Sequence, residues 1–180
     1  MTLRRRYCEA PPFSDFLDTV DTNADLWKAL ARRAEVPDAA VERVRALGRR
    51  WHLLVILEDW CGDAVNTIPV LAKLADLAEN LDLRVVSRDA NPDLMDAHLA
   101  PGGARAIPVV ITLDADFVEL GSWGSRPAPL TRWVETVGTT ISKEDRYREI
   151  RRWYARDRGV TTLDEVIGIL EGRAGSLRAA

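Results

Sequence analysis

A continuous apolar run ends just before a cysteine, and a long helical pattern follows that cysteine. The run is Leu53-Leu54-Val55-Ile56-Leu57, and Cys61 comes after three further residues. Apolar residues then recur at helical spacing at Ile68, Leu71, Leu74, Leu77 and Leu81. An apolar run without alternation is typical of a strand buried on both faces, as in sheets covered by helices. We therefore predict a strand, then Cys61 at a helix start, in an α/β fold.

Further strands and one short helix are predicted downstream. The predicted elements are a strand at Leu83–Ser87, a helix at Pro92–Leu99, strands at Pro108–Leu113 and Phe117–Gly121, and a hairpin turn at 114–116. The two strands that flank the long helix should be parallel, because a helical crossover joins them. The order β-α-β, helix, β-hairpin predicts a three-layer α/β sandwich with a central mixed sheet.

Helical patterns occupy both ends of the chain. We expect one domain over residues 1–180, with a helical N-terminal extension at 1–50, a core at about 51–140 and C-terminal helices at 141–180. Gly159 and Thr161 are expected to divide the last helical region. The basic run Arg4-Arg5-Arg6 is interpreted as a frayed terminus.

Composition argues against several classes of protein. The net charge of −3 gives no broad basic surface for nucleic acid. No segment approaches the roughly 20 apolar residues of a membrane span. Two cysteines, Cys8 and Cys61, and two histidines form no zinc-binding pattern, so no metal site is expected. With no secretory signal pattern at the N-terminus, we expect a cytoplasmic protein.

Cys61 is the candidate nucleophile. Unpaired backbone N–H groups and the positive end of the helix dipole both favour a thiolate at a helix start. The adjacent Gly62 leaves room for close approach to the sulfur. The alternative is that Cys61 is a small, inert, buried residue.

The residues around Cys61 resemble a known active site. Trp60-Cys61-Gly62-Asp63-Ala64 resembles the Trp-Cys-Gly-x-Cys site of thioredoxins. Downstream, the segments at 89–92 (Asp-Ala-Asn-Pro) and 103–108 (Gly-Ala-Arg-Ala-Ile-Pro) resemble two further thioredoxin segments in the same order. The chain resembles the bacterial thioredoxin-like family that carries Trp-Cys-Gly-Asp at the active site. The segment 121–127 fits that group, but the sequence assigns it no chemical role.

This resemblance implies a groove beside the sulfur. It implies a cis peptide bond before Pro108 and a backbone at Ile107 that binds an extended peptide or glutathione. Trp60, Gly62 and Asp63 would complete the substrate-binding residues around catalytic Cys61. The alternative for Pro108 is an ordinary proline at a strand start.

The sequence departs from thioredoxin at the residues that serve the resolving step, in which a second cysteine releases the substrate from the first. Ala64 replaces the cysteine that resolves the mixed disulfide. Val55 and Val85 occupy the positions of the buried aspartate and its lysine partner. Either this protein has lost the resolving step, or this group of thioredoxin-like proteins never used the aspartate–lysine pair. Cys8 would replace the resolving cysteine only if the N-terminal segment folded across the site.

Acidic residues surround the cysteine in sequence. Glu58, Asp59 and Asp63 predict an acidic rim that opposes the ionisation of Cys61.

Three functions remain open from the sequence. The favoured one is a single-cysteine redox protein acting on disulfides or mixed disulfides of proteins or small thiols, with an external thiol completing the cycle. No bound cofactor is expected, and glutathione or another small thiol is the candidate co-substrate. The alternatives are a non-catalytic binding or adaptor module that uses the groove, and a peroxide-responsive cysteine sensor. The oligomeric state is not indicated.

Overall fold

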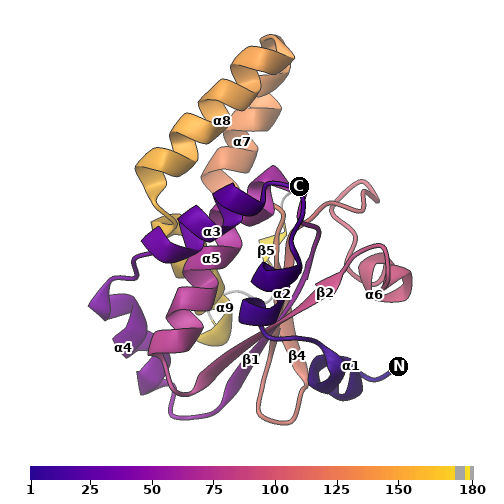
Figure 1. Cartoon of the computed structure of the whole chain (residues 1–180), viewed down its shortest axis with the longest axis vertical. Helices are drawn as coiled ribbons and strands as arrows, with labels where there is room; N and C mark the ends of the chain where they lie inside the picture. Colours follow the sequence, from indigo (N-terminus) through magenta and orange to yellow (C-terminus); the bar gives the residue numbers. More distant parts are fainter. Residues whose placement is uncertain (173–176, 179–180) are drawn as a thin grey trace.

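The fold is a mixed sheet flanked by helices, and the computed structural model describes residues 1–172 and 177–178 of it (Figure 1). The strands are β1 (Trp51–Leu57), β2 (Leu81–Ser87), β3 (Val109–Leu113), β4 (Glu119–Gly124) and β5 (Leu177–Arg178). The helices are α1 (Leu3–Glu9), α2 (Phe13–Thr19), α3 (Ala24–Arg33), α4 (Asp38–Ala46), α5 (Gly62–Leu77), α6 (Pro92–Asp96), α7 (Ala128–Thr136), α8 (Lys143–Asp157) and α9 (Val160–Leu170), with a 3-10 turn at Gly138–Thr140. None of the helices in this described part has the length and apolar character that a membrane crossing requires.

The sheet has the predicted mixed topology, in the order β2-β1-β3-β4-β5. β1 pairs with β2 in parallel, and helix α5 joins them. β3 is antiparallel to both β1 and β4. This arrangement confirms the expected three-layer α/β sandwich.

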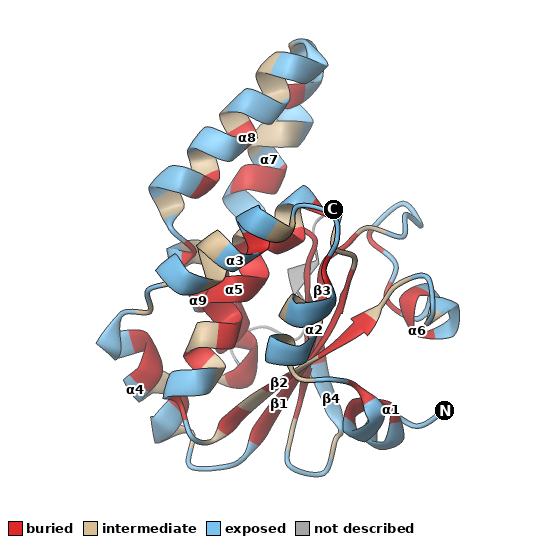
Figure 2. Ribbon diagram, in the orientation of Figure 1, coloured by how far each residue is buried: buried red, intermediate tan, exposed pale blue. Residues whose placement is uncertain are grey.

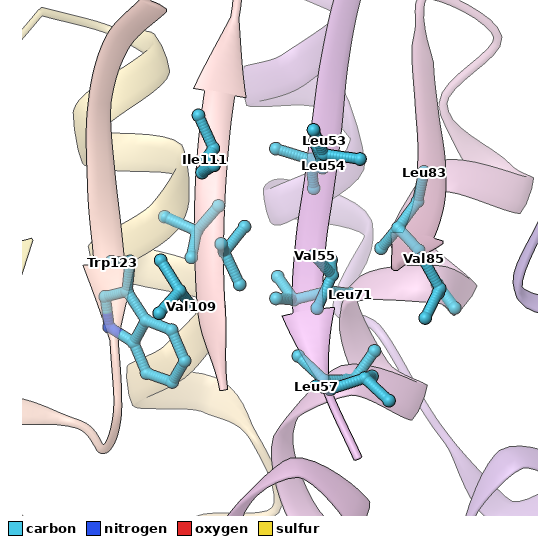
Figure 3. Packing of buried hydrophobic residues seen from close by; sticks show 14 of the residues in the cluster. Leu53, Leu54, Val55, Leu57, Leu71, Leu83, Val85, Val109, Ile111 and Trp123 are labelled. Atoms are coloured by element: carbon cyan, nitrogen blue, oxygen red, sulfur yellow. The ribbon is translucent and has the colours of Figure 1, made fainter. Parts of the chain in front are cut away.

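The apolar run forms the centre of the sheet. All seven residues of β1 are buried, because the strand has neighbours on both edges and helices on both faces. Helices α5 and α9 contact each other and pack on β2 and on β3 and β4 respectively. Helices α1 and α6 lie across the sheet from them in Figure 1. Figure 3 shows side chains of β1 such as Leu53 and Val55 among those of β2, β3 and α5.

The frayed-terminus interpretation of Arg4-Arg5-Arg6 was wrong. These residues lie inside α1, which Thr2 caps at its N-terminus. Arg6 is buried and bonds to Asn91 and Asp93, the latter at 2.6 Å. The positive charge therefore fastens α1 to the start of α6 rather than facing solvent.

Several observed strand and helix boundaries differ from the predicted ones because of nearby hydrogen bonds. Leu81 begins β2 instead of ending the preceding helix, because α5 stops at Leu77 and the Trp51 N–H bonds to Asn80. The predicted strand at Phe117–Gly121 is shifted to Glu119–Gly124. Its turn is longer than expected, because the Asp114 carboxylate accepts the N–H groups of residues 116 and 118.

Three further helix boundaries differ from the predictions. α6 ends at Asp96 rather than Leu99, and His98 just after it bonds to the Leu94 carbonyl. Gly159 does separate the last two helices, but Thr161 lies inside α9. The helices of the C-terminal region end at Leu170, and Leu177–Arg178 pairs with β4 as a short strand.

Helices α7 and α8 form an arm that extends from the sheet region (Figures 1 and 2). Leu130, Ile150 and Tyr154 form a small separate core between them, with Trp133, Val134 and Trp153 packed against it. The base of this arm lies beside the start of α5, since Tyr154 bonds to Asp63.

Gly124 is a steric constraint on the sheet. Its φ is +141°, and a Cβ there would lie 2.1 Å from the carbonyl oxygen of Pro108. We predict that Gly124→Ala lowers the free energy of unfolding by about 1–3 kcal/mol, as overpacking does elsewhere. Urea unfolding followed by circular dichroism measures the change.

Gly62→Ala is the matched control for this substitution. A Cβ at Gly62 meets nothing within 4 Å, so the free energy of unfolding should be unchanged or slightly higher. Equal stability of the two variants would show that the contact between Gly124 and Pro108 is not a constraint.

Candidate functional site

Cys61 joins the start of α5 to the loop before β3. It is the N-cap residue of α5, and its Sγ accepts a hydrogen bond from the Ala64 N–H at 3.4 Å. The Cys61 thiol donates to the carbonyl oxygen of Ile107, also at 3.4 Å. Only 6% of the residue is exposed. The sulfur is therefore held by two backbone groups, one from each segment.

The Ile107–Pro108 peptide bond is cis. Both residues are buried, and Pro108 lies directly before β3, which pairs with β1. The Gly124–Ser125 peptide bond at the end of β4 is also cis. Because Val109 pairs with Gly124, these two turns lie side by side near Cys61.

Burial controls the ionisation of Cys61. It raises the pKa of the thiol to about 11, and the negative charge of Asp63 acts in the same direction. The Ala64 and Asp63 N–H groups and the charge of Arg126 act to lower it, but they are weaker. The sequence expectation that the helix start would favour a thiolate is therefore wrong for this structure, because removal from water outweighs the helix terminus.

Asp63 has two partners on distant segments. Its carboxylate forms an ion pair with Arg126 at 2.7 Å, and the Tyr154 hydroxyl donates to it at 2.8 Å. Burial lowers the pKa of Arg126, but Asp63 outweighs this and raises it, so the guanidinium stays charged. Burial is also the main reason that the pKa of Tyr154 is raised. Asp63 thus connects α5 to the β4–α7 loop and to α8.

The predicted acidic rim is not formed by all three carboxylates. Glu58 accepts from the Ser87 hydroxyl and from the Asp89 N–H, so it supports the loop after β2. Asp59 accepts from the N–H groups of residues 21 and 22, before α3. Of the three, Asp63 is the one among the main causes of the pKa shift of Cys61.

Most of the other predicted site residues line the same pocket as Cys61, whereas Pro108 is buried and does not line it. Trp60 is 48% exposed, and the Arg88 guanidinium lies 4.9 Å from the centre of its ring. Gly62 faces open space, so the fold itself does not require a glycine there. Trp60, Cys61, Gly62, Asp63 and Ile107 all line one pocket of about 590 Å³.

Sequence reasoning missed several residues of this pocket, among them Ser125, Arg126, Tyr147 and Arg151. Arg126 and Ser125 come from the 121–127 segment, for which the sequence suggested no role. Tyr147 and Arg151 come from the run of mixed charges that forms α8. One signal was present: Tyr147, Ile150, Arg151 and Tyr154 recur at helical spacing within that run.

A family model described as thioredoxin matches residues 10–145. The chain belongs to the thioredoxin family. No curated protein matches it. Among solved structures, it is similar to a protein of unknown function from Pseudomonas aeruginosa (22% identity, TM-score 0.74), with coverage of 97% of this chain and 99% of that chain. It is also similar to an HIV epitope-scaffold (23% identity, TM-score 0.73), with coverage of 97% and 100% respectively. At these identities the two structures support the fold.

This thioredoxin-family site contains a single cysteine at the start of α5. Ala64, in the position of the second thioredoxin cysteine, is fully buried. Val55 and Val85 are direct partners in the β1–β2 pair and are both buried, so this pair supplies neither an acid nor a base (Figure 3). Cys8 is exposed on α1, where its neighbour Tyr7 packs on His52 at the opposite end of β1 from Cys61. The structure therefore does not bring Cys8 to the site.

No metal-binding group is seen among the described residues. Within residues 1–172 and 177–178, no three His, Cys, Asp or Glu residues lie where they would hold a metal ion.

Asp63 and Arg126 should shift the pKa of Cys61 in opposite directions. We predict that Asp63→Asn lowers it, because an anion is removed and Arg126 keeps its charge. Arg126→Gln should raise it, because a nearby cation is removed. A shift of about one pH unit corresponds to a tenfold change in thiolate fraction. Thiolate absorbance as a function of pH, in a Cys8→Ser background, measures both shifts.

The control for this prediction is Tyr154→Phe, which removes a hydrogen bond to Asp63 but no formal charge at neutral pH. It should move the pKa of Cys61 less than either charge substitution. A pKa that rises in Asp63→Asn would contradict the electrostatic role of this carboxylate.

Proposed function

We propose that this protein catalyses thiol–disulfide exchange through Cys61 alone. The observation that carries the proposal is the position of Sγ, between the start of α5 and the cis-proline loop, on the wall of a pocket. The thioredoxin family to which the chain belongs supports a redox role. We also place the chain among thioredoxin-like proteins with a Trp-Cys-Gly-Asp motif, and in a reducing cytoplasmic compartment, which fits two free cysteines.

The proposed reaction has two exchange steps. The Cys61 thiol first loses its proton to solvent, and the thiolate attacks one sulfur of a disulfide. A bond forms between the two sulfurs, the substrate S–S bond breaks, and the other half leaves as a thiolate that takes up a proton. An external thiolate then attacks the mixed disulfide and releases Cys61. The external thiol is needed because Ala64 offers no second sulfur.

The surroundings of Sγ determine when the first step occurs. The Ile107 carbonyl accepts a hydrogen bond from the neutral thiol and so favours the protonated form. After deprotonation, the Ala64 N–H and the charge of Arg126 stabilise the thiolate. With a pKa of about 11, roughly one molecule in ten thousand carries the thiolate at pH 7. We therefore propose slow attack at neutral pH by a thiolate that is intrinsically strongly nucleophilic.

The same pKa supports a second candidate function, a binding module. A neutral, buried thiol bonded to Ile107 serves as a structural contact without any reaction. In that case the pocket would hold a peptide or partner, and Cys61→Ser would leave capture unchanged. A peroxide sensor is less well supported, because oxidation depends on thiolate character and exposure.

We predict that exchange activity depends on Cys61 and not on Cys8. The assay follows reduction of a small mixed disulfide by an external thiol. Cys8→Ser should keep the parent rate, whereas Cys61→Ser should show only the uncatalysed rate. Mass spectrometry of the Cys8→Ser variant, without external thiol, should show one substrate half attached at Cys61. Equal rates for Cys61→Ser and the parent would refute the catalytic role.

Ala64→Cys provides a sharper test of the missing resolving step. The Ala64 N–H already lies 3.4 Å from Sγ, so a thiol on this residue is placed close to the sulfur of Cys61. We expect this variant to release the bound substrate half without external thiol and to end with an intramolecular disulfide. Ala64→Ser, of similar size, is the control and should retain the mixed disulfide. Persistence of the mixed disulfide in Ala64→Cys would show that a second sulfur here is not sufficient.

A further inference from the structure

The pocket at Cys61 has a strongly positive lining. Four arginines from four separate segments line it: Arg88 after β2, Arg105 before the cis-proline, Arg126 after β4 and Arg151 in α8. Among the lining residues that the structure describes, the one carboxylate is Asp63. Arg126 already balances that charge at 2.7 Å. Arg88, Arg105 and Arg151 therefore remain to bind a ligand in the pocket.

Arg88 and Arg105 form ion pairs whose partners are exposed to solvent. Arg105 is bound to Asp96 by two contacts of 2.7 Å, but both side chains are about half exposed. Arg88 pairs with Asp89 at 2.8 Å, and that carboxylate is 66% exposed. Ion pairs with exposed partners contribute little to stability, so a ligand carboxylate can replace either partner. Neither Asp89 nor Asp96 lines the pocket.

Arg151 is the most available of the three. It is exposed on α8, and the described part of the chain provides no ion pair for it. Its neighbours Arg148 and Arg152 are both paired, with Asp145 and Glu149 respectively. Arg151 is thus the cation on this stretch of α8 that lines the pocket with no ion pair among the described residues.

We propose that the pocket selects small disulfides that carry carboxylates. This inference rests on the proposed exchange reaction at Cys61. The volume of about 590 Å³ is in the range of pockets for small molecules. The exposed face of Trp60 offers an apolar surface for the rest of the ligand, and Arg88 lies against that ring. Arg105 and Arg151 bind the carboxylates.

The chemistry is the two-step exchange described above. One carboxylate-bearing half stays on Cys61 while the other half leaves as its thiol. A second molecule of an anionic thiol then attacks the mixed disulfide, which restores Cys61 and forms a new small disulfide. The positive lining attracts both the substrate and the releasing thiol, since both carry the same charge.

The test compares three small disulfides with similar reactive bonds. Glutathione disulfide carries carboxylates, hydroxyethyl disulfide is uncharged, and cystamine carries amines. The measured quantity is the second-order rate of mixed-disulfide formation at Cys61 in the Cys8→Ser protein. Rates with hydroxyethyl disulfide normalise the other two. We expect glutathione disulfide to react faster than cystamine, and salt to reduce the difference.

The decisive variant is Arg105→Gln combined with Arg151→Gln. Both residues are exposed, so folding should be preserved. We expect the rate with glutathione disulfide to fall roughly fivefold, while the rate with hydroxyethyl disulfide is unchanged. The matched control is Arg32→Gln with Arg132→Gln, which removes the same charge from exposed positions outside the pocket. That control should retain most of the preference for the anionic disulfide.

The outcomes separate the two proposals. Equal normalised rates for all three disulfides, or equal loss in the two double variants, would overturn the selection of anions and leave the exchange reaction standing. Failure of every disulfide, including the uncharged one, to react at Cys61 would overturn the exchange reaction itself. Loss of the anionic preference in the pocket variant alone supports the inference.

Discussion

The hydrogen bond from the Cys61 thiol to the Ile107 carbonyl is the contact on which the site depends. It connects the start of α5 with the loop that precedes β3. That loop is in turn fixed by Gly124, which has no Cβ to collide with the Pro108 carbonyl. The start of α5 and the cis-proline turn before β3 therefore meet at the sulfur of Cys61. The packing that forms this bond also buries the sulfur, and burial is the main reason that the pKa of Cys61 is raised.

Asp63 extends this arrangement to the helical arm. Its contacts with Arg126 and Tyr154 connect the first turn of α5 to the base of α7 and α8. The carboxylate makes ionisation of Cys61 harder, and the guanidinium that it binds makes ionisation easier. One ion pair thus fastens the arm and moderates the pKa of the cysteine. Arg151 on the same arm adds positive charge to the pocket.

The sequence was sufficient for the existence of the first four strands and for the position of the cysteine, because these follow from local patterns, whereas β5 was not predicted. The apolar run of β1 and the helical spacing after Cys61 are visible within about thirty residues. The arm contacts were not predictable in this way. Arg126 lies 63 positions after Asp63 in the sequence, and Tyr154 lies 91 positions after it. The periodicity of apolar residues does not indicate contacts over such separations. Long-range partners also explain why Arg6 was misinterpreted as a terminal residue.

The sign of the pKa shift was the other error, and its cause is general. A helix start favours a thiolate only when the sulfur keeps enough contact with water or charge. Here Cys61 is 6% exposed, and burial dominates. Sequence motifs indicate which residue occupies a helix terminus, but they do not report how deeply it is buried. Burial depends on how Ile107 and the β4–α7 loop close around the sulfur.

The most direct measurement is the rate at which a small neutral alkylating reagent modifies Cys61 in the Cys8→Ser protein, as a function of pH. The thiolate is the reacting species, so the rate follows its fraction. We expect the rate to increase about tenfold per pH unit from neutral pH and to level off only near pH 11. A rate that already levels off near pH 7 would contradict the structure's central feature, a neutral thiol held by burial and by the Ile107 carbonyl.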